Sequence, residues 1–417
     1  MYQDISLLVT YIMQTDIYLL LLFLFIFDIP RYLLATFASI FIRPWASLDS
    51  DTYQPKVSVI ISVHNATQNF ITNLQAIKTQ TLKPFEIIVV NDGSTNETAE
   101  ILQRAYKAGL IDSIITHSMR CGKSASINHA VRFARGELIL NLDDDTLLKS
   151  TTLHRLSLAF RDPKVAIASG SLFVRNKDES LVTSLQAIEY MTSMAEGRFM
   201  LNLFDAVSCC SGALSMFRRS IYMAIGGNNA GPGEDLELTM RLRKLKFKIA
   251  FIHDAQASIL GPSTFLGLIK QRLRWDRDSL CIRVNMYKEL SLHQFYEANT
   301  DVLARMDFII FEFIPTLIFP FYLIYIFMIF GNLFFIYLFS IYILVLGFYL
   351  VNIALVMLIF RYRLNLFDLA ALLIFPLYQG IIMKLVRFIA FSSEILFSTS
   401  HDDDYVPKRI RHALYDI

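Results

Sequence analysis

Cysteine is scarce in this chain, which contains four among its 417 residues. Cys209 and Cys210 are adjacent and therefore poor disulfide partners, while Cys121 and Cys281 lack the CxxC spacing of a zinc site. The pattern argues against a disulfide framework and indicates reduced thiols in the cytosol.

The chain also lacks a strong excess of either charge. Its formal net charge of +2 argues against a nucleic-acid-binding protein, which would present a concentrated basic face. The glycine-rich stretch that should precede Gly122-Lys123-Ser124 in a Walker-type NTPase is missing as well. Because a lysine near a helix N-terminus opposes the helix dipole, we expect Lys123 to face an anion.

Basic residues are absent from the start of the chain, where none occurs before Arg31. A cleavable signal peptide would begin with positive charge, so we expect none here. Residues 17–42 are dense in apolar side chains, and we interpret them as one kinked membrane span. The missing positive charge predicts that the N-terminus lies outside and that the following domain lies in the cytosol.

Long apolar runs return in residues 308–397. Residues 308–330 and 334–360 are each long enough to span a membrane, with a turn predicted at Gly331 and Asn332. The basic residues at 361–363 are expected inside. Residues 366–397 contain charges and form either one span with an interfacial helix or two short passes.

The side of the C-terminus stays open at this stage. The basic tail, which contains Lys408, Arg409 and Arg411, favours the inside, whereas three C-terminal spans would place it outside. The chain therefore divides into an N-terminal span with its linker (1–50), a cytosolic domain (51–300), and C-terminal membrane helices with a basic tail (301–417). We expect a multi-pass protein of the plasma membrane.

The cytosolic domain alternates strand and helix patterns. Strands are predicted at 57–63, 85–90, 111–115 and 138–142, and helices at 69–79, 97–108 and 124–134. The β-branched run at 57–63 is typical of a strand buried on both sides. This order predicts a mostly parallel sheet covered by helices on both faces, which binds ligands beyond the carboxyl ends of its strands.

Two polar clusters follow predicted strands. In Asn91-Asp92-Gly93-Ser94, Asp92 can accept hydrogen bonds from a base or ribose, or the segment can simply be a turn that caps the next helix. In Asp143-Asp144-Asp145, the first and third side chains point the same way in an extended segment and could share one Mg²⁺ or Mn²⁺. An acidic loop without a metal is the alternative for this second cluster.

Two further clusters lie on predicted helices. Gly233-Glu234-Asp235 opens a helix, where acidic residues are common because of the helix dipole. In the segment 271–275, Arg274 could hold a pyrophosphate and Trp275 offers a flat face for a sugar ring. A basic amphipathic helix at the membrane surface is compatible with this role.

In this order, the four clusters resemble those of the family 2 glycosyltransferases with a GT-A-type domain. The resemblance is to the membrane-bound branch that contains the hyaluronan, chitin, cellulose and poly-N-acetylglucosamine synthases, and it covers about residues 50–285 with the flanking membrane layout. It implies a Rossmann-like, mostly parallel α/β sheet with helices on both faces, flanked by transmembrane and interfacial helices.

The resemblance also implies roles for residues that bind the donor, expected to be a UDP-sugar. Asn65 and Asp92 would contact the uridine, and Lys123 would help to hold the donor. Asp143 and Asp145 would match the DxD pair that binds the nucleotide and a Mg²⁺ or Mn²⁺ ion, and Arg274 would contact the pyrophosphate.

On the acceptor side, Asp235 would match the catalytic base. The segment 271–275 matches the QxxRW signature of chain-building members. The residues expected to bind the acceptor are Ser211, Gly212, Glu234, Gln271 and Trp275. Two positions depart from the family pattern: Gly233 replaces the usual Thr before the Glu-Asp pair, and Asn91 replaces the first Asp of DDG.

The implied reaction is the inverting transfer of a sugar from a nucleotide-sugar to a growing β-linked polysaccharide or oligosaccharide, coupled to export through a channel of membrane helices. A non-processive enzyme that loads one sugar onto a lipid carrier would usually lack the QxxRW signature, so Trp275 discriminates against it. A transporter or a catalytically silent nucleotide-sugar sensor is a further alternative. The sequence does not specify the sugar.

Overall fold

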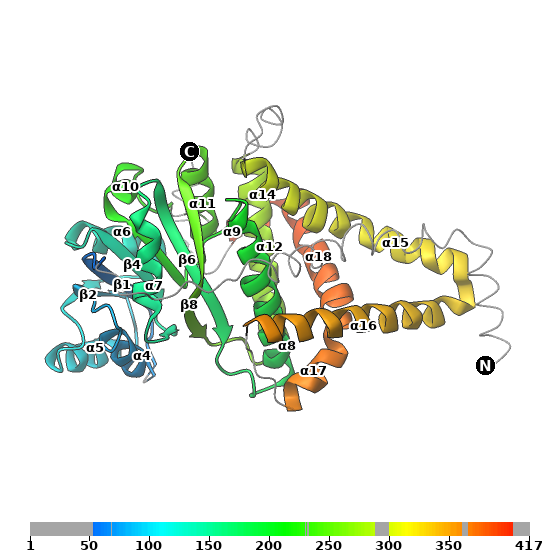
Figure 1. The fold of residues 1–417 in the computed structure, drawn as a ribbon, viewed down its shortest axis with the longest axis horizontal. Helices are drawn as coiled ribbons and strands as arrows, with labels where there is room; N and C mark the ends of the chain where they lie inside the picture. The colour runs from blue at the N-terminus through cyan, green and yellow to red at the C-terminus, as the bar shows by residue number, and fades with distance from the viewer. Residues whose placement is uncertain are drawn as a thin grey trace.

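The computed structural model describes residues 53–67, 69–229, 231, 233–287, 300–360 and 366–402. The predicted N-terminal span at 17–42, the basic residues at 361–363 and the tail residues 408–411 lie outside the described residues. The described part consists of a mixed α/β domain and an elongated helical part that extends away from it (Figure 1).

The core of the α/β domain is an eight-stranded sheet in the order β3-β2-β1-β4-β7-β6-β8-β5. Strands β1 to β4 are parallel, β7 is antiparallel to both β4 and β6, β6 and β8 are parallel, and β5 is antiparallel to β8. The strands are β1 (Val57–Val63), β2 (Glu86–Asp92), β3 (Ser113–His117), β4 (Leu138–Asp143), β5 (Leu147–Leu148), β6 (Val165–Val174), β7 (Leu214–Arg218) and β8 (Lys248–Ile259).

Helices cover both faces of this sheet, as the sequence predicts. On one face, β1 side chains such as Val59 and Ile61 pack against α4, α5 and α7. On the other face, Ile60 of β1 packs with residues of α6, α10 and α11. The helices of this domain are α4 (Phe70–Lys78), α5 (Thr98–Lys107), α6 (Lys123–Phe133), α7 (Thr152–Leu158), α8 (Leu181–Tyr190), α9 (Arg198–Leu203), α10 (Arg219–Ala224), α11 (Glu234–Lys244) and α12 (Phe265–Leu280).

The predicted elements of the first half agree with the structure to within about two residues. β1 is confirmed over Val57–Val63, while β2 and β3 each end two residues later than predicted. Because of that shift, Asp92 and His117 are the last residues of β2 and β3, and they are register partners. Strands β2 and β3 therefore end side by side in a carboxylate and an imidazole.

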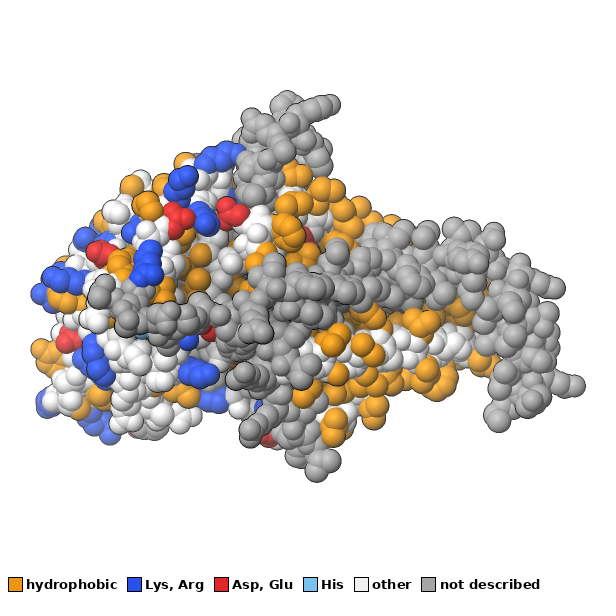
Figure 2. Space-filling view, in the orientation of Figure 1, with side chains coloured by type: hydrophobic (Ala, Val, Ile, Leu, Met, Phe, Trp, Pro, Cys, Tyr) orange, Lys and Arg blue, Asp and Glu red, His pale blue; other side chains and the backbone are white. Residues whose placement is uncertain are grey.

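The helical part is strongly apolar. Its helices are α14 (Thr300–Phe308), α15 (Ile314–Phe330), α16 (Phe334–Phe360), α17 (Leu366–Leu377) and α18 (Met383–Phe397). A short 3-10 turn, Gly331–Leu333, joins α15 to α16 where the sequence predicts a turn. Two helical stretches, Val302–Met357 and Asp368–Phe397, are long and apolar enough to cross a membrane by length and composition. Among the described residues of this part, the coloured side chains visible in Figure 2 are mainly hydrophobic, whereas Lys and Arg gather on the α/β domain.

The two parts share a hydrophobic core. Leu185 and Ile188 of α8 and Leu268 of α12 are buried with Ile353 of α16 and Phe375 of α17. Helix α12 also packs along α18. The helix that contains residues 271–275 is therefore held between the sheet domain and the apolar helices.

Candidate active site

Lys123, the first residue of α6, lies at the centre of the candidate site. Its Nζ lies 2.5 Å from Asp143 Oδ1 and 3.5 Å from Glu234 Oε1, and it donates a hydrogen bond of 3.1 Å to the carbonyl oxygen of Gly212. Burial alone would lower the pKa of this ammonium, but Asp143 and Glu234 outweigh that effect and raise it. Lys123 is therefore held as a cation among acidic groups from two other elements.

The acidic segment after β4 is crowded with negative charge. Burial, together with the charges of Asp143 and Asp145, raises the pKa of Asp144 to about 7. Burial and then Asp143 raise the pKa of Asp145 as well. Asn73 fixes this turn by donating to the carbonyl oxygen of Asp144 at 2.7 Å. A divalent cation would relieve the mutual repulsion of these carboxylates, so the residues present fit the metal that the fold family implies.

Gly233 determines how the next acidic pair is presented. It precedes α11 with a φ of +57°, in the left-handed region that favours glycine. A Cβ at this position would lie 2.7 Å from Ile282 Cδ1 and 3.2 Å from Asp278 Cβ. The departure from the usual Thr therefore has a local reason: the segment 278–282 packs closely against the start of α11.

Glu234 and Asp235 open α11 and face different partners. Asp235 Oδ2 accepts a hydrogen bond of 2.8 Å from the backbone N–H of Gly212, and Oδ1 accepts one of 2.8 Å from Leu236. Glu234 faces Lys123 instead. Burial raises the pKa of Glu234, and the Lys123 ammonium offsets only part of that rise. The pair thus brings a backbone-anchored carboxylate next to the carboxyl group that faces Lys123.

Asp92 is almost fully buried at the end of β2. Its carboxylate accepts hydrogen bonds from His117 Nδ1 at 3.0 Å and from the backbone N–H groups of Cys121 at 2.7 Å and Gly122 at 2.8 Å. Burial would raise the pKa of Asp92, but these hydrogen bonds outweigh it and hold the pKa below its usual range. Asp92 thus fixes the loop that leads directly to Lys123.

Asn65 lies across from the segment that follows β2. Its φ of +60° is in the left-handed region, which asparagine tolerates better than most residues. Its side-chain oxygen accepts a hydrogen bond from the backbone N–H of Thr95 at 2.9 Å, and its backbone N–H donates to Ser94 Oγ at 3.0 Å. The loops after β1 and β2 are thereby joined at the candidate donor end.

Helix α12 brings residues 271–275 to the same part of the molecule. Gln271 Oε1 is buried and has no hydrogen-bond partner among the described residues, as expected of a group that awaits a polar ligand. Trp275 packs against the sheet core. Arg272 stacks 4.7 Å from the centre of the Trp275 ring and bonds to Glu189 at 2.9 Å.

The structure joins many of the predicted site residues in one network. Gly212 is its hub, since its carbonyl oxygen accepts from Lys123 and its N–H donates to Asp235. Ser211, its neighbour, donates its N–H to Ser169 Oγ at 3.3 Å. Arg274 is half-buried on α12.

Sequence reasoning missed two residues, one in this network and one on α12. Asn141 donates to the carbonyl oxygen of Gly212 at 2.8 Å from inside β4; a polar residue within a buried apolar run was a readable signal. Arg272 received no role, and its neighbours in the sequence give no sign of Glu189, which lies 83 residues away.

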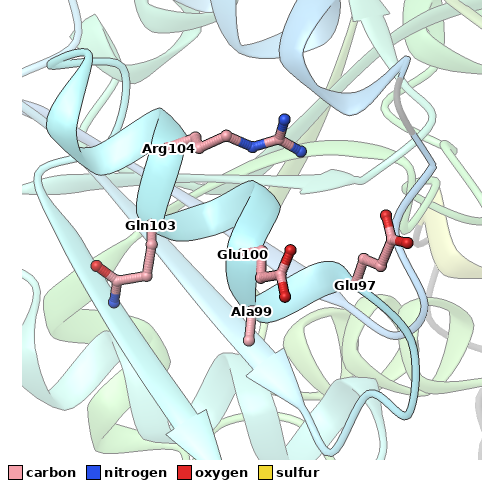
Figure 3. A pocket seen from close by; sticks show the side chains of 5 residues that line it. All are labelled: Glu97, Ala99, Glu100, Gln103 and Arg104. Atoms are coloured by element: carbon pink, nitrogen blue, oxygen red, sulfur yellow. The ribbon is translucent and has the colours of Figure 1, made fainter.

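One surface hollow lies apart from this network. It lies along α5 and is lined by Glu97, Ala99, Glu100, Gln103 and Arg104 (Figure 3). None of these residues contacts the carboxylates around Lys123 in the hydrogen bonds and ion pairs described above. The hollow is therefore not part of the candidate active site.

Comparisons with known proteins agree with this arrangement. The profile of the glycosyl transferase family 2 matches residues 58–226. A protein of Azorhizobium caulinodans named N-acetylglucosaminyltransferase is 30% identical over 271 residues, which cover 60% of this chain and 68% of that protein. A protein of the same name from Bradyrhizobium diazoefficiens is 30% identical over 237 residues, which cover 54% of this chain and 49% of that protein. The matched region thus spans about half to two thirds of these relatives.

A solved structure supports the fold. The mannosyltransferase PcManGT from Pyrobaculum calidifontis, solved in complex with GDP-Man and Mn²⁺, superimposes with a TM-score of 0.56. The superposition covers 88% of this chain and 95% of that protein at 18% identity. At this identity the likeness shows a shared GT-A-like architecture and no more.

Proposed function

This chain belongs to glycosyl transferase family 2, and from that premise we propose that it transfers N-acetylglucosaminyl units from a UDP-sugar to a growing β-linked polysaccharide at the cytosolic face of a membrane. The sugar is proposed from the names of the relatives. The nucleotide, the acceptor and the location are proposed from the residues and the apolar helices.

One observation carries this proposal. The backbone of Gly212 is fixed between Lys123 on the candidate donor side and Asp235 on the candidate acceptor side. A cation suited to a diphosphate and a carboxylate suited to proton removal are thus both anchored to the backbone of one residue, through its two adjacent peptide groups. Positioning of this kind supplies much of the rate of a group transfer.

Asp235 is the proposed general base. It takes the proton of the acceptor hydroxyl as that oxygen forms a bond to the anomeric carbon of the donor, and the bond from this carbon to the diphosphate breaks on the opposite face. An α-linked donor then gives a β-linked product. The hydrogen bond from Gly212 orients Asp235 and leaves lone pairs on both carboxylate oxygens for the acceptor.

On the donor side, Lys123 is proposed to bind the diphosphate, with Arg274 from α12. Asp143 and Asp145 would hold a Mg²⁺ or Mn²⁺ ion, which supplies Lewis-acid stabilisation of the leaving diphosphate when bound. Asp92 and Asn65 are proposed to shape the uridine end through the loops that they fix.

Polymer extension rests on α12. Gln271 offers a buried oxygen that has no partner within the described part of the chain, and Trp275 offers an aromatic ring; these suit a hydroxyl and the apolar face of a sugar. Because α12 also packs along α18, a chain leaving this site would be next to the apolar helices. We propose that these helices span the membrane and guide the polymer outward.

Asp235→Asn tests the proposal directly. Asparagine keeps an oxygen for the N–H of Gly212 but cannot take a proton at neutral pH, so we expect turnover to fall by about 10²- to 10⁴-fold while UDP-sugar binding stays intact. Asp162→Asn, on an exposed aspartate that pairs with Lys248, is the matched control. Near-normal transfer of radiolabelled N-acetylglucosamine by Asp235→Asn would refute the assignment.

Product size separates the proposal from its nearest rival. A purified, lipid-embedded enzyme that extends a polymer should give glycosidase-sensitive products of high mass. A single labelled glycolipid would instead show transfer of one sugar to a lipid carrier.

A further inference from the structure

A second cluster of reactive side chains lies behind the loop that leads to Lys123. Asp92 and His117 end neighbouring parallel strands and are register partners, and His117 Nδ1 lies 3.0 Å from Asp92 Oδ1. Both side chains are nearly buried, with exposed fractions of 4% and 11%. Cys121 completes the group, because potential ligand atoms of the three residues all lie within 4.8 Å of one another.

We propose that Asp92, His117 and Cys121 form a binding site for a thiophilic divalent cation such as Zn²⁺. A set of one imidazole nitrogen, one carboxylate oxygen and one sulfur suits zinc, whereas Mg²⁺ and Ca²⁺ prefer oxygen ligands alone. Three protein ligands leave a fourth position for water.

The three ligand atoms, which lie within 4.8 Å of one another, have to adjust their spacing to accept the ion. Zinc bonds of about 2.0–2.3 Å in a tetrahedron place ligand atoms roughly 3.3–3.6 Å apart. The His117–Asp92 pair, at 3.0 Å, has to open by a few tenths of an ångström. The Cys121 backbone is already tethered, since its N–H donates to Asp92 at 2.7 Å, while its Sγ, which donates to the carbonyl oxygen of Met119 at 3.3 Å, has to leave that partner to reach the ion.

The groups that surround the three ligands also suit a metal site. Metal-binding imidazoles usually bond through their second nitrogen, which fixes the ring. Here His117 Nε2 lies 3.0 Å from His129 Nδ1, with the two ring planes 13° apart. The second oxygen of Asp92 accepts from the N–H of Gly122 at 2.8 Å. Imidazole and carboxylate therefore each have an outer hydrogen-bond partner.

Proton balance follows from the ligand chemistry. Because a carboxylate only accepts, the His117 Nδ1 that faces Asp92 now carries a proton. On metal binding the neutral His117 ring carries its proton on Nε2 and donates a hydrogen bond to His129 Nδ1, while His129, whose Nδ1 is the donor of this pair in the metal-free state, carries its own proton on Nε2, so the two rings together keep two protons. The Cys121 thiol loses its proton to solvent, so binding at neutral pH releases about one proton per ion.

The consequence for transfer rests on the proposed function. A bound ion would lock Asp92 to the segment 121–122, immediately before Lys123, and would resist rearrangement of this loop around a nucleotide. We therefore expect Zn²⁺ to inhibit the enzyme in competition with the UDP-sugar, and Mg²⁺ not to.

Metal binding by the full-length protein in lipid, without any sugar, is the primary test. Co²⁺ and Zn²⁺ titrations should show one tight equivalent, with a cobalt–thiolate absorption band and release of about one proton. Cys121→Ser and His117→Gln should each weaken Zn²⁺ binding at least about tenfold and abolish or shift the band. Cys209→Ser and His154→Gln are the matched controls. Thermal unfolding in chelator shows whether each variant is folded.

Equal Zn²⁺ affinity of the wild type and Cys121→Ser, or equal competition by Mg²⁺, would overturn the site. This outcome does not depend on catalysis, so it is distinct from failure of the proposed transferase. Inhibition by Zn²⁺ that persists in folded Cys121→Ser would refute the link between the site and the donor.

Discussion

Lys123 Nζ and Asp143 Oδ1 lie 2.5 Å apart, which joins the first residue of α6 to the last residue of β4. The ammonium also reaches Glu234, so a single lysine counters acidic groups from two elements. A donor diphosphate and its metal would take over these charges: the phosphate oxygens would pair with Lys123 and the metal with Asp143. The ion pair thus keeps both groups in place until the donor arrives.

Lys123→Met should therefore weaken the use of donor more than the fold. A hydrogen bond to a charged group contributes about 1.5–3 kcal/mol, so we expect KM for the UDP-sugar to rise at least about tenfold. Lys107→Met at the end of α5 is the control, because that lysine lies on the surface. Steady-state kinetics with UDP-N-acetylglucosamine measure the effect, and an unchanged KM for Lys123→Met would rule out the donor role.

The tight contact at Gly233 gives a second prediction. Gly233→Ala should destabilise the protein by about 1–2 kcal/mol from its left-handed φ, with an added cost from contact with Ile282. Gly109→Ala is a matched control, because Gly109 has a φ of +71° and a Cβ added there would have no atom of the described residues within 4 Å.

The two variants separate backbone strain from crowding. Thermal unfolding should show a larger loss of stability for Gly233→Ala than for Gly109→Ala. Adding Ile282→Val to Gly233→Ala should recover part of that loss, because it removes the crowding methyl group. Equal losses would show that the segment 278–282 does not restrict position 233.

The sequence predicts the parallel half of the sheet well because each of its strands is a short, compact run built mainly on Val, Ile or Leu. Val57–Val63 is buried along nearly its whole length, and its residues alone specify that environment. The insertion of β7 between β4 and β6 is different. It depends on antiparallel pairing across more than seventy residues, as in Asn141 with Ser215, and no local pattern encodes such a pairing.

The same distinction applies to the site. Asp143 and Asp235 could be recognised from the sequence, because Asp143 follows a predicted strand and Asp235 lies at the start of a predicted helix, each within a known motif. The contacts of Gly212 with Lys123 and Asp235 arise only when the chain folds. Cys121 shows the limit most clearly: its spacing from other cysteines predicts no metal site, while the fold brings it to Asp92 and His117.

His253 predicts a loss of stability in acid. It is buried in β8, and burial lowers its pKa from 6.5 to about 4. The unfolded chain therefore takes up a proton below about pH 6.5, while the folded protein does so only near pH 4. The free energy of unfolding should keep its full value above pH 6.5 and fall by up to about 3 kcal/mol as the pH drops to 4.

Urea unfolding in detergent at pH 7 and pH 5 tests this expectation. His253→Gln should have a smaller difference between the two pH values than the wild type, and His154→Gln should retain the full difference. If His253→Gln loses as much stability in acid as the wild type, other groups cause the pH dependence.

The acidic segment after β4 predicts a metal requirement. EDTA should abolish transfer, and Mn²⁺ or Mg²⁺ should restore it. Asp145→Asn should raise the Mn²⁺ concentration for half-maximal activity by about tenfold or more, because one of the two proposed ligand carboxylates is lost. Asp162→Asn should leave this concentration unchanged. Full activity in EDTA would exclude the metal role of Asp143 and Asp145.

Glu189 should control product length through Trp275. Its Oε2 accepts from Arg272 at 2.9 Å and from the Tyr378 hydroxyl at 2.7 Å, and Arg272 in turn stacks on Trp275. Glu189→Gln removes the charge that holds Arg272, so Trp275 should orient the acceptor less well. We expect shorter polymers with an unchanged KM for the donor, because none of these groups contacts Lys123 or Asp143 in the structure described.

Graded and matched variants make this last prediction specific. Tyr378→Phe removes one hydrogen bond to the Glu189 carboxylate, worth about 1.5–3 kcal/mol, but leaves the charge that holds Arg272, so it should shorten the product less than Glu189→Gln does. Glu100→Gln on α5 changes the same chemical group far from α12 and should give wild-type lengths. Product sizes on gels, measured together with thermal unfolding, show whether Glu189 positions the acceptor or only stabilises the fold. If Glu189→Gln lowers the unfolding temperature but leaves the length distribution intact, the network stabilises the junction with the apolar helices and does not position the acceptor.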